Sequence, residues 1–110
     1  MTHLALIFAA SIAALVAAQQ AVTEITSEQV EQYKVKLEAG CVKDALRSGL
    51  EVTRARAFCN CSTKHVGENM SFAEWQSASL QSSQQAEIEE MKILAPHIRK
   101  AAAACQSTVK

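Results

Sequence analysis

Residues that interrupt helices are scarce in this sequence: among 110 residues there are three glycines and one proline. The sequence also lacks runs of alternating β-branched residues, which are the pattern of a half-buried strand. Alanine, glutamine, glutamate and lysine, which are good helix formers, are abundant instead. These absences predict an all-α protein.

An excess of charge of either sign is absent as well, because 11 lysines and arginines balance 11 aspartates and glutamates. The two signs are mixed along the chain, and no basic stripe is interleaved with aromatic residues. We therefore expect no nucleic acid and no acidic membrane surface as a partner held by bulk electrostatics.

Motifs of catalysis are missing too. The sequence contains no glycine-rich phosphate loop, no nucleophile elbow and no His-Glu metal motif. Glu87, Glu89 and Glu90 form an acidic cluster, but no neighbouring residue would desolvate one of these carboxylates and make it a general acid. The expected protein is therefore not an enzyme and has no cofactor.

No apolar run is long enough to cross a membrane. Residues 4–16 are almost entirely apolar, whereas a bilayer needs roughly twenty such residues. The small residues that follow this run are of the kind that signal peptidase recognises. We predict a signal peptide over residues 1–18, with cleavage after Ala18 favoured over cleavage after Ala21, and one domain over residues 19–110. No cysteine comes directly after this apolar run, so a lipoprotein anchor is not expected. No membrane anchor is therefore expected after cleavage.

Four cysteines, Cys41, Cys59, Cys61 and Cys105, all lie in the predicted domain. A domain of this length buries a low fraction of its surface and usually needs covalent links. An even number of cysteines in a short exported chain predicts disulfides. It also predicts an oxidising compartment, either the periplasm or the extracellular space.

Apolar spacing predicts three helices. The first begins near Thr26 with a capping box and ends near Gly49. The second is shorter, with Thr53 as its N-cap and Gly67 as its terminator. Gly40 lies inside the first helix at a cost of about 1 kcal/mol relative to alanine, and a bend or a close backbone contact is the expected reason.

The third helix opens with a capping box of Ser71 and Glu74 and is the longest. It runs to Cys105, with a kink or break expected just before Pro96, and a break there would give a fourth helix. Its expected apolar stripe consists of Trp75, Leu80, Ile88, Met91, Leu94, Ala95, Ile98, Ala102 and Cys105. Phe72 is placed in the core together with Trp75.

Cys59 and Cys61 are two positions apart in the second helix, so their side chains point about 200° apart around its axis. They cannot bond to each other there, because a disulfide needs converging Cβ atoms. Each is expected to bond to Cys41 or Cys105 instead. The positions of Cys41 and Cys59 about the turn near Leu50 favour the pairs Cys41–Cys59 and Cys61–Cys105, with Cys41–Cys61 and Cys59–Cys105 as the alternative.

Two sharper interpretations of the Cys-x-Cys pair compete with the structural one. Cys61 and His65 share a helix face and would begin a copper or zinc site, with Cys59 as a further candidate ligand. A closed site needs more ligands, and the only other histidine of the domain is His97. A redox role is disfavoured because reactive pairs sit at exposed helix N-termini, whereas this pair lies in mid-helix. We therefore expect no metal site.

Both asparagines of the chain, Asn60 and Asn69, lie in N-x-Ser sequons. In a eukaryotic host Asn69, in the turn before the third helix, would be the glycosylation site. Asn60, between two bridged cysteines, would be a poor acceptor. Coincidence is the favoured explanation of the two sequons.

The order of these elements carries a resemblance. A first helix with Cys41 is followed by residues 57–61 (AFCNC), by residues 70–74 (MSFAE) and by a last cysteine at Cys105. This order resembles a group of small exported bacterial proteins with an aromatic-Cys-x-Cys signature, most of them uncharacterised. The resemblance covers nearly the whole predicted domain and implies a periplasmic or secreted helical protein, with no activity to transfer. Lysine and arginine are absent before the apolar run, which departs from the bacterial pattern and leaves the host open.

The expected function is binding of another macromolecule, a protein, in the cell envelope or outside the cell. The first alternative is a carrier for a small apolar ligand, because an alanine-rich helical core with few aromatics leaves room for a cavity. The second is a thiol redox or metal-handling protein that uses Cys59, Cys61 and His65.

Overall fold

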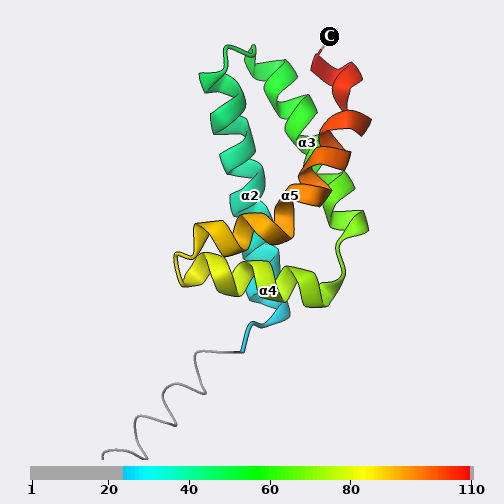
Figure 1. Cartoon of the computed structure of the whole chain (residues 1–110). Coiled ribbons are helices and arrows are strands. Elements are labelled where there is room, and N and C mark those ends of the chain that lie inside the picture. The colour runs from blue at the N-terminus through cyan, green and yellow to red at the C-terminus, as the bar shows by residue number, and fades with distance from the viewer. Residues whose placement is uncertain (1–23, 110) are drawn as a thin grey trace, which may run out of the picture.

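A computed structural model describes residues 24–109, which form four α-helices and a short 3-10 helix, without any strand in that range (Figure 1). The elements are α2 (Ser27–Arg47), α3 (Val52–Asn69), α4 (Phe72–Ser83), α5 (Glu87–Ala104) and η1 (Gln106–Val109). The expected all-α class is confirmed, whereas the expected number of three helices is wrong. No helix within residues 24–109 has the length and apolar character needed to span a bilayer. The predicted signal peptide lies outside the described residues.

Side-chain caps fix where the helices begin. Thr26 accepts a hydrogen bond from the backbone amide of Gln29 at 3.1 Å, and the Gln29 side chain accepts one from the Thr26 amide at 2.8 Å. Ser71 and Glu74 form the same reciprocal pair before α4. Both predicted capping boxes are confirmed, and each satisfies two amides that the first helical turn leaves free.

The second helix is longer at both ends than its sequence predicts. Its N-cap is Glu51, whose carboxylate accepts from the amide of Thr53 at 3.1 Å, and not Thr53 itself. At the other end α3 passes through Gly67 to Asn69. Glycine weakens a helix but keeps its backbone N–H, so the hydrogen-bond ladder can continue through Gly67.

A left-handed glycine ends the first helix. Gly49 has φ 96°, and the amides of Gly49 and Leu50 donate to the carbonyls of Leu46 and Ala45. These two bonds make a Schellman motif, in which the residue after the C-cap takes a left-handed conformation that glycine adopts without strain. The motif turns the chain back so that α3 packs against α2.

The same motif separates α4 from α5, but a glutamine occupies the left-handed position. Gln85 has φ 58°, and its amide donates to the Ser82 carbonyl while the Ala86 amide donates to that of Gln81. Because no glycine or proline marks this turn, the sequence predicts one continuous helix across it. The fourth helix therefore arises at Gln85 and not at Pro96.

Replacing Gln85 by glycine is expected to raise the free energy of unfolding by about 1 kcal/mol, because a residue with a Cβ is disfavoured in the left-handed region by roughly that amount. The matched variant Gly49→Gln should lower the free energy of unfolding by at least as much. Urea denaturation of both variants measures the two changes. A loss of stability in Gln85→Gly would show that the glutamine side chain stabilises the turn by some other contact.

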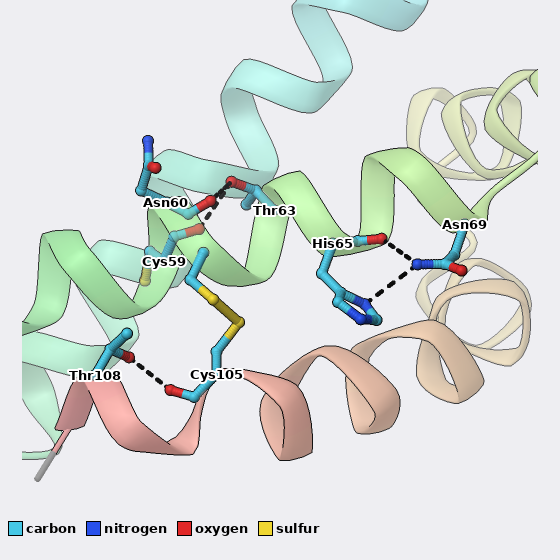
Figure 2. Close-up of a disulfide and its surroundings, with 8 residues drawn as sticks. Cys59, Asn60, Thr63, His65, Asn69, Cys105 and Thr108 are labelled. Atoms are coloured by element: carbon cyan, nitrogen blue, oxygen red, sulfur yellow. Dashed lines mark hydrogen bonds between the residues drawn. A yellow bond between two sulfur atoms is a disulfide. The ribbon is translucent and has the colours of Figure 1, made fainter.

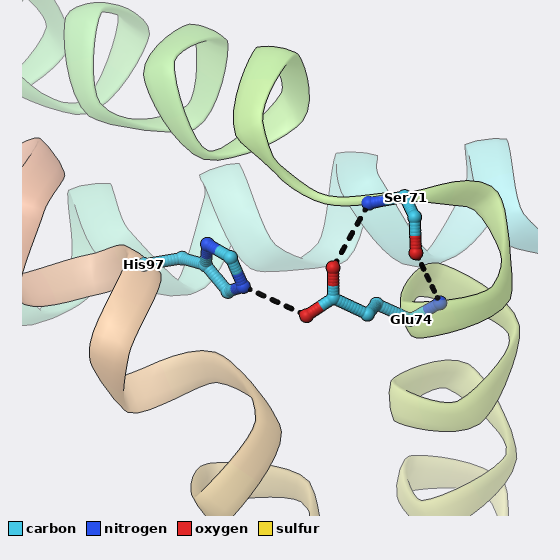
Figure 3. A network of polar contacts seen from close by, with 3 residues as sticks. All are labelled: Ser71, Glu74 and His97. Atoms are coloured by element: carbon cyan, nitrogen blue, oxygen red, sulfur yellow. Dashed lines mark hydrogen bonds and ion pairs between the residues drawn. The ribbon is translucent and has the colours of Figure 1, made fainter.

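Pro96 lies inside α5, which continues beyond it to Ala104. Figure 1 shows α5 changing direction near its middle, with its first half beside α4 and its second half beside α3. Figure 3 places His97, the next residue, at this bend. The expected kink is confirmed, since proline lacks an N–H and crowds the preceding turn. The helix is bent there and not broken.

The core lies where α4 and α5 meet the N-terminal half of α2 and the C-terminal end of α3. Its buried residues are Val30, Tyr33, Val66, Met70, Trp75, Ala78, Leu94 and Ala101. The placement of Trp75 in the core is confirmed, since the residue is 4% exposed, but that of Phe72 is wrong, since it is 51% exposed. Ile88, at 76% exposed, also leaves the expected stripe. The turn at Gln85 separates the two halves of that stripe, so one continuous helical phase does not describe both.

Two disulfides hold the helices together. Cys41 bonds to Cys59 and joins α2 to α3, with the Cα atoms 5.7 Å apart. Cys61 bonds to Cys105 and joins α3 to the end of α5, with the Cα atoms 5.9 Å apart (Figure 2). These are the two pairs that the cysteine positions favour. The middle helix therefore carries a covalent link on each of two nearly opposite faces.

Removing the Cys61–Cys105 bond is expected to cost more stability than removing the Cys41–Cys59 bond, because the loops span 44 and 18 residues. The chain-entropy argument gives about 4 kcal/mol for the longer loop and about 3 kcal/mol for the shorter one. Each pair is replaced by two alanines, and guanidinium unfolding of both variants gives the free energies. The reverse order would mean that the enthalpy of the native contacts outweighs loop entropy.

Candidate functional site

A groove of about 500 Å³ lies between α2 and α5. The middle helix α3 forms its floor with Phe58, Ser62, Thr63 and Val66. The backbones of Ser27–Arg47 and Glu87–Ala104 do not pack directly against each other, so the two walls stay apart. We call this space the α2–α5 groove. Its volume lies within the range of small-molecule sites, roughly 300–1,000 Å³.

Small residues keep the groove open. Gly40, Cys41 and Ala45 line its α2 wall, and Ala101 and Ala102 line its α5 wall. A Cβ atom added to Gly40 would meet no atom within 4 Å, so neither a close backbone contact nor crowding requires a glycine there. The expected close contact at Gly40 is therefore wrong, because the position faces open space in the groove.

Apolar side chains form the rim on the α5 side. Met91 and Ile98 line the groove and are 51% and 42% exposed. In a closed three-helix bundle these residues would be covered by α2. Their exposure beside an apolar floor marks the groove as a surface that can bury further apolar area.

The end of the groove nearest α4 is closed by an aromatic and polar cluster. The Tyr33 hydroxyl donates a hydrogen bond to the Glu90 carboxylate and so links α2 to α5. Trp75 packs edge-on against Tyr33, with ring centroids 6.1 Å apart, and the Lys34 ammonium lies 5.0 Å from its ring centroid. Burial, together with the hydrogen bond and negative charge of Glu90, raises the pKa of Tyr33, so the hydroxyl stays protonated and remains a donor.

A second polar cluster, Ser71, Glu74 and His97, joins the start of α4 to the bend of α5 (Figure 3). Nε2 of His97 lies 2.9 Å from one Glu74 carboxylate oxygen, and the other oxygen accepts from the Ser71 amide at 3.1 Å. The Ser71 hydroxyl accepts from the Glu74 amide and does not contact the histidine. A catalytic triad needs the histidine next to the serine, so this arrangement positions helices and does not activate a nucleophile.

The hydrogen bond from the Ser71 backbone, followed by that from His97, holds the pKa of Glu74 below its usual 4.5. A lowered pKa in the folded state means that ionised Glu74 favours folding above pH 4.5 and loses this effect as the pH falls through the folded-state pKa. Glu74→Gln keeps a capping-box side chain but removes the charge. We expect the variant to be less stable than the parent at pH 7, and the difference to shrink toward pH 3, in urea titrations at both pH values. A difference that does not depend on pH would assign the effect to packing.

The remaining predicted site residues do not form a second site. Figure 2 shows His65 beside Asn69, where Nδ1 of His65 lies 3.3 Å from the Asn69 amide nitrogen. Cys59 and Cys61 have their sulfur atoms in separate disulfides, so neither is a free thiolate that could ligate a metal or exchange electrons. Within residues 24–109 no three histidine, cysteine or acidic residues gather in a metal-binding cluster.

Asn69 lies in a different place from the one expected. It is the last residue of α3 and not part of a turn, and its side-chain amide donates to the His65 carbonyl at 2.7 Å. Its side chain is exposed, as is that of Asn60 in the middle of α3. Access alone therefore does not distinguish the two sequons.

Sequence reasoning did not identify the groove residues as a set. Its alternative of a cavity in an alanine-rich core did not say between which helices such a space would lie. The two features that mark the place are Gly40 inside a helix and the alanines Ala101 and Ala102. Lys34 and Glu90 could not be assigned, because the groove brings them together from helices far apart in the chain.

Comparisons with known proteins give no relative from which a function could be inferred. No protein-family model, no curated protein and no solved structure matches the chain. What the protein binds is therefore argued from the groove and the other exposed surfaces.

Proposed function

We propose that the protein is an exported, non-enzymatic carrier that holds a small apolar ligand in the α2–α5 groove. The observation that carries the proposal is Gly40, which faces open space inside a helix and lines an apolar groove. Glycine there costs about 1 kcal/mol relative to alanine. No neighbouring atom requires it, and its local effect is to keep the groove wide.

The disulfides support a groove that exists before the ligand arrives. One bond fixes α2 to α3, and the other fixes the end of α5 to α3. Each wall is thereby attached to the floor, so the walls need no mutual packing to stay in place. A preformed site spares the ligand the cost of ordering the protein, and burial of apolar area contributes about 25 cal/mol per Å².

Export is part of the proposal. Disulfides persist in the periplasm and outside the cell, whereas the cytosol keeps thiols reduced. The two bonds are compatible with such a compartment, and the predicted signal peptide would deliver the chain to it. A carrier in either place would meet apolar molecules in water and shield them.

A macromolecular partner is the second candidate, and a different surface favours it. Val35, Ala39 and Val42 lie on one face of α2, on the other side of the α2–α3 hairpin from the groove. Val35 is 68% exposed. The spacing of four and three positions is the one with which an apolar helix face meets a second helix. A protein that presents an amphipathic helix would fit this face.

Filling the groove tests the carrier proposal. Gly40→Leu places a larger side chain in the open space and should weaken the binding of a fluorescent fatty acid about tenfold or more, which corresponds to a loss of 1.4 kcal/mol. Gly67→Leu is the matched control, because Gly67 is also helical, also has no atom within 4 Å of an added Cβ, and does not line the groove. The control should bind as the parent does, with displacement of the probe as the measurement.

Absence of binding by the parent protein, or equal binding by the parent and Gly40→Leu, would overturn the carrier proposal. Capture of a protein partner that Gly40→Leu retains and Val35→Asp loses would favour the second candidate instead. Thermal unfolding of both leucine variants checks that the fold is intact.

A further inference from the structure

The face of α2 that points away from the core carries a line of apolar residues. Val35, Ala39, Val42 and Leu46 follow one another at steps of four, three and four positions. This alternation is that of the a and d positions of a heptad repeat, which form the seam between two paired helices. Val35 is 68% exposed and Leu46 is 41% exposed, and Ala39 is exposed as well. We call these four residues the α2 seam.

The described helices leave the seam uncovered. The residues by which α2 joins the core, Val30, Tyr33 and Leu37, lie about 180° from the seam around the helix axis. The middle helix α3 lies along one side of the seam, where Ala57 and Val35 border the same hollow. A further helix can therefore reach the seam without displacing any described element.

Charged residues flank the seam with one sign on each side. Glu31 and Glu38 occupy g positions of the heptad, on the side of α3, and Lys36 and Lys43 occupy e positions on the other side. In a parallel pair of helices each g residue faces the e residue five positions later in the other chain. Glu31 then faces Lys36 of the second copy, and Glu38 faces Lys43. An antiparallel pair would instead bring glutamates to glutamates and lysines to lysines.

The neighbouring charges do not remove this preference. Glu31 pairs with Lys34 of its own chain at 3.2 Å, but this pair is exposed and of little energetic weight. Within residues 24–109, Glu38 and the two lysines across the seam form no ion pair. Arg56 and Lys64 of α3 lie beside the glutamates. They reduce the repulsion between facing glutamates but not that between facing lysines, so the antiparallel pair remains disfavoured.

We propose that α2 is the contact of a parallel homodimer, in which the seams of two copies pack against each other about a two-fold axis along the helices. The amphipathic helix that fits this face is thus the α2 of a second copy, because the flanking charges complement themselves. The helix α3 covers one flank of the seam and leaves room for one partner helix. The apolar seam supplies most of the affinity, and the charges set the orientation.

The expected dimer is weak. From Val35 to Leu46 the seam extends eleven residues, or about 16 Å at 1.5 Å per residue, so the contact belongs to the small interfaces of transient complexes. Pairing has no cost of helix formation, because α2 is already folded and is bonded to α3 through Cys41. No seam residue lines the α2–α5 groove, so this inference does not depend on the carrier proposal.

Sedimentation velocity of the exported protein over a range of concentrations tests the dimer. The parent is expected to approach the mass of two chains at high concentration. Val35→Asp buries a charge in both halves of the contact and should weaken the dimer about tenfold or more. Ile88→Asp is the matched control, because Ile88 is a β-branched residue that is 76% exposed on α5, away from the seam. The control should associate as the parent does, and thermal unfolding checks that both variants are folded.

Charge reversal tests the flanking pairs. Glu38→Lys or Lys43→Glu alone should weaken the dimer about threefold or more, since each change replaces two attractive contacts by two repulsive ones. The double variant, which exchanges the two signs, is expected to restore most of the affinity. Weakening by the double variant that equals the sum of the two single effects would overturn this pairing.

Cross-linking tests the orientation. A carbodiimide joins a carboxylate to an ammonium group in contact with it, and mixing chains labelled with heavy nitrogen with unlabelled chains identifies bonds between copies. The expected products join Glu38 to Lys43 and Glu31 to Lys36 of the other copy. A dimer that forms neither product between copies would overturn the parallel arrangement.

The remaining outcomes separate the dimer from the carrier. A parent that stays monomeric at every concentration would overturn the dimer, and binding of the fluorescent fatty acid by that monomer would leave the carrier proposal intact. A monomeric parent that captures another protein through Val35 would assign the seam to that protein instead. A dimer that Gly40→Leu dissociates and Val35→Asp does not would place the contact in the groove and overturn the seam.

Discussion

The whole described domain is arranged around α3, because both disulfides end on it. Cys59 and Cys61 lie two positions apart and therefore on nearly opposite faces of one helix, so one bond leads to α2 and the other to the end of α5. The flanking helices are bonded covalently to the middle helix and not to each other. A small domain buries a low fraction of its surface, and direct packing of α2 on α5 would bury more of it. Covalent links replace it, and a groove can remain in its place.

This arrangement divides the molecule into a packed end and an open end. Val30, Tyr33, Met70, Trp75 and Leu94 belong to the apolar cluster nearest α4, and the hydrogen bond between Tyr33 and Glu90 connects the two walls there. Toward the tip of the α2–α3 hairpin, where the groove continues, the residues along the walls are small. The packed end supplies most of the apolar burial, so the open end can keep features that a stability-driven sequence would replace, above all Gly40.

Local signals in the sequence predicted much of the fold. The capping boxes at Thr26 and Ser71, the glycine turn at Gly49, the kink at Pro96 and the preferred cysteine pairs all depend on neighbouring residues or on helix geometry, and each matches the structure. The turn at Gln85 was missed because a non-glycine residue occupies a left-handed position, which no local pattern marks. The groove was missed as a place because it depends on how far α2 and α5 stand apart, and that distance is set by tertiary structure. Ile88 was placed in the core on one helical phase that the turn at Gln85 interrupts, whereas Phe72 was placed there for its aromatic side chain beside Trp75, and of these two aromatic residues α4 turns only Trp75 into the core.

The bend at Pro96 divides α5 into two halves that pack against different helices. The first half is paired with α4 through the turn at Gln85, and the second half is tied to α3 through Cys105. Pro96 has no amide proton, so the carbonyl one turn before it has no helical donor, and a change of angle at this point breaks no further backbone hydrogen bond. The two halves of α5 can therefore pack against different helices at different angles, while the helix stays continuous through Pro96.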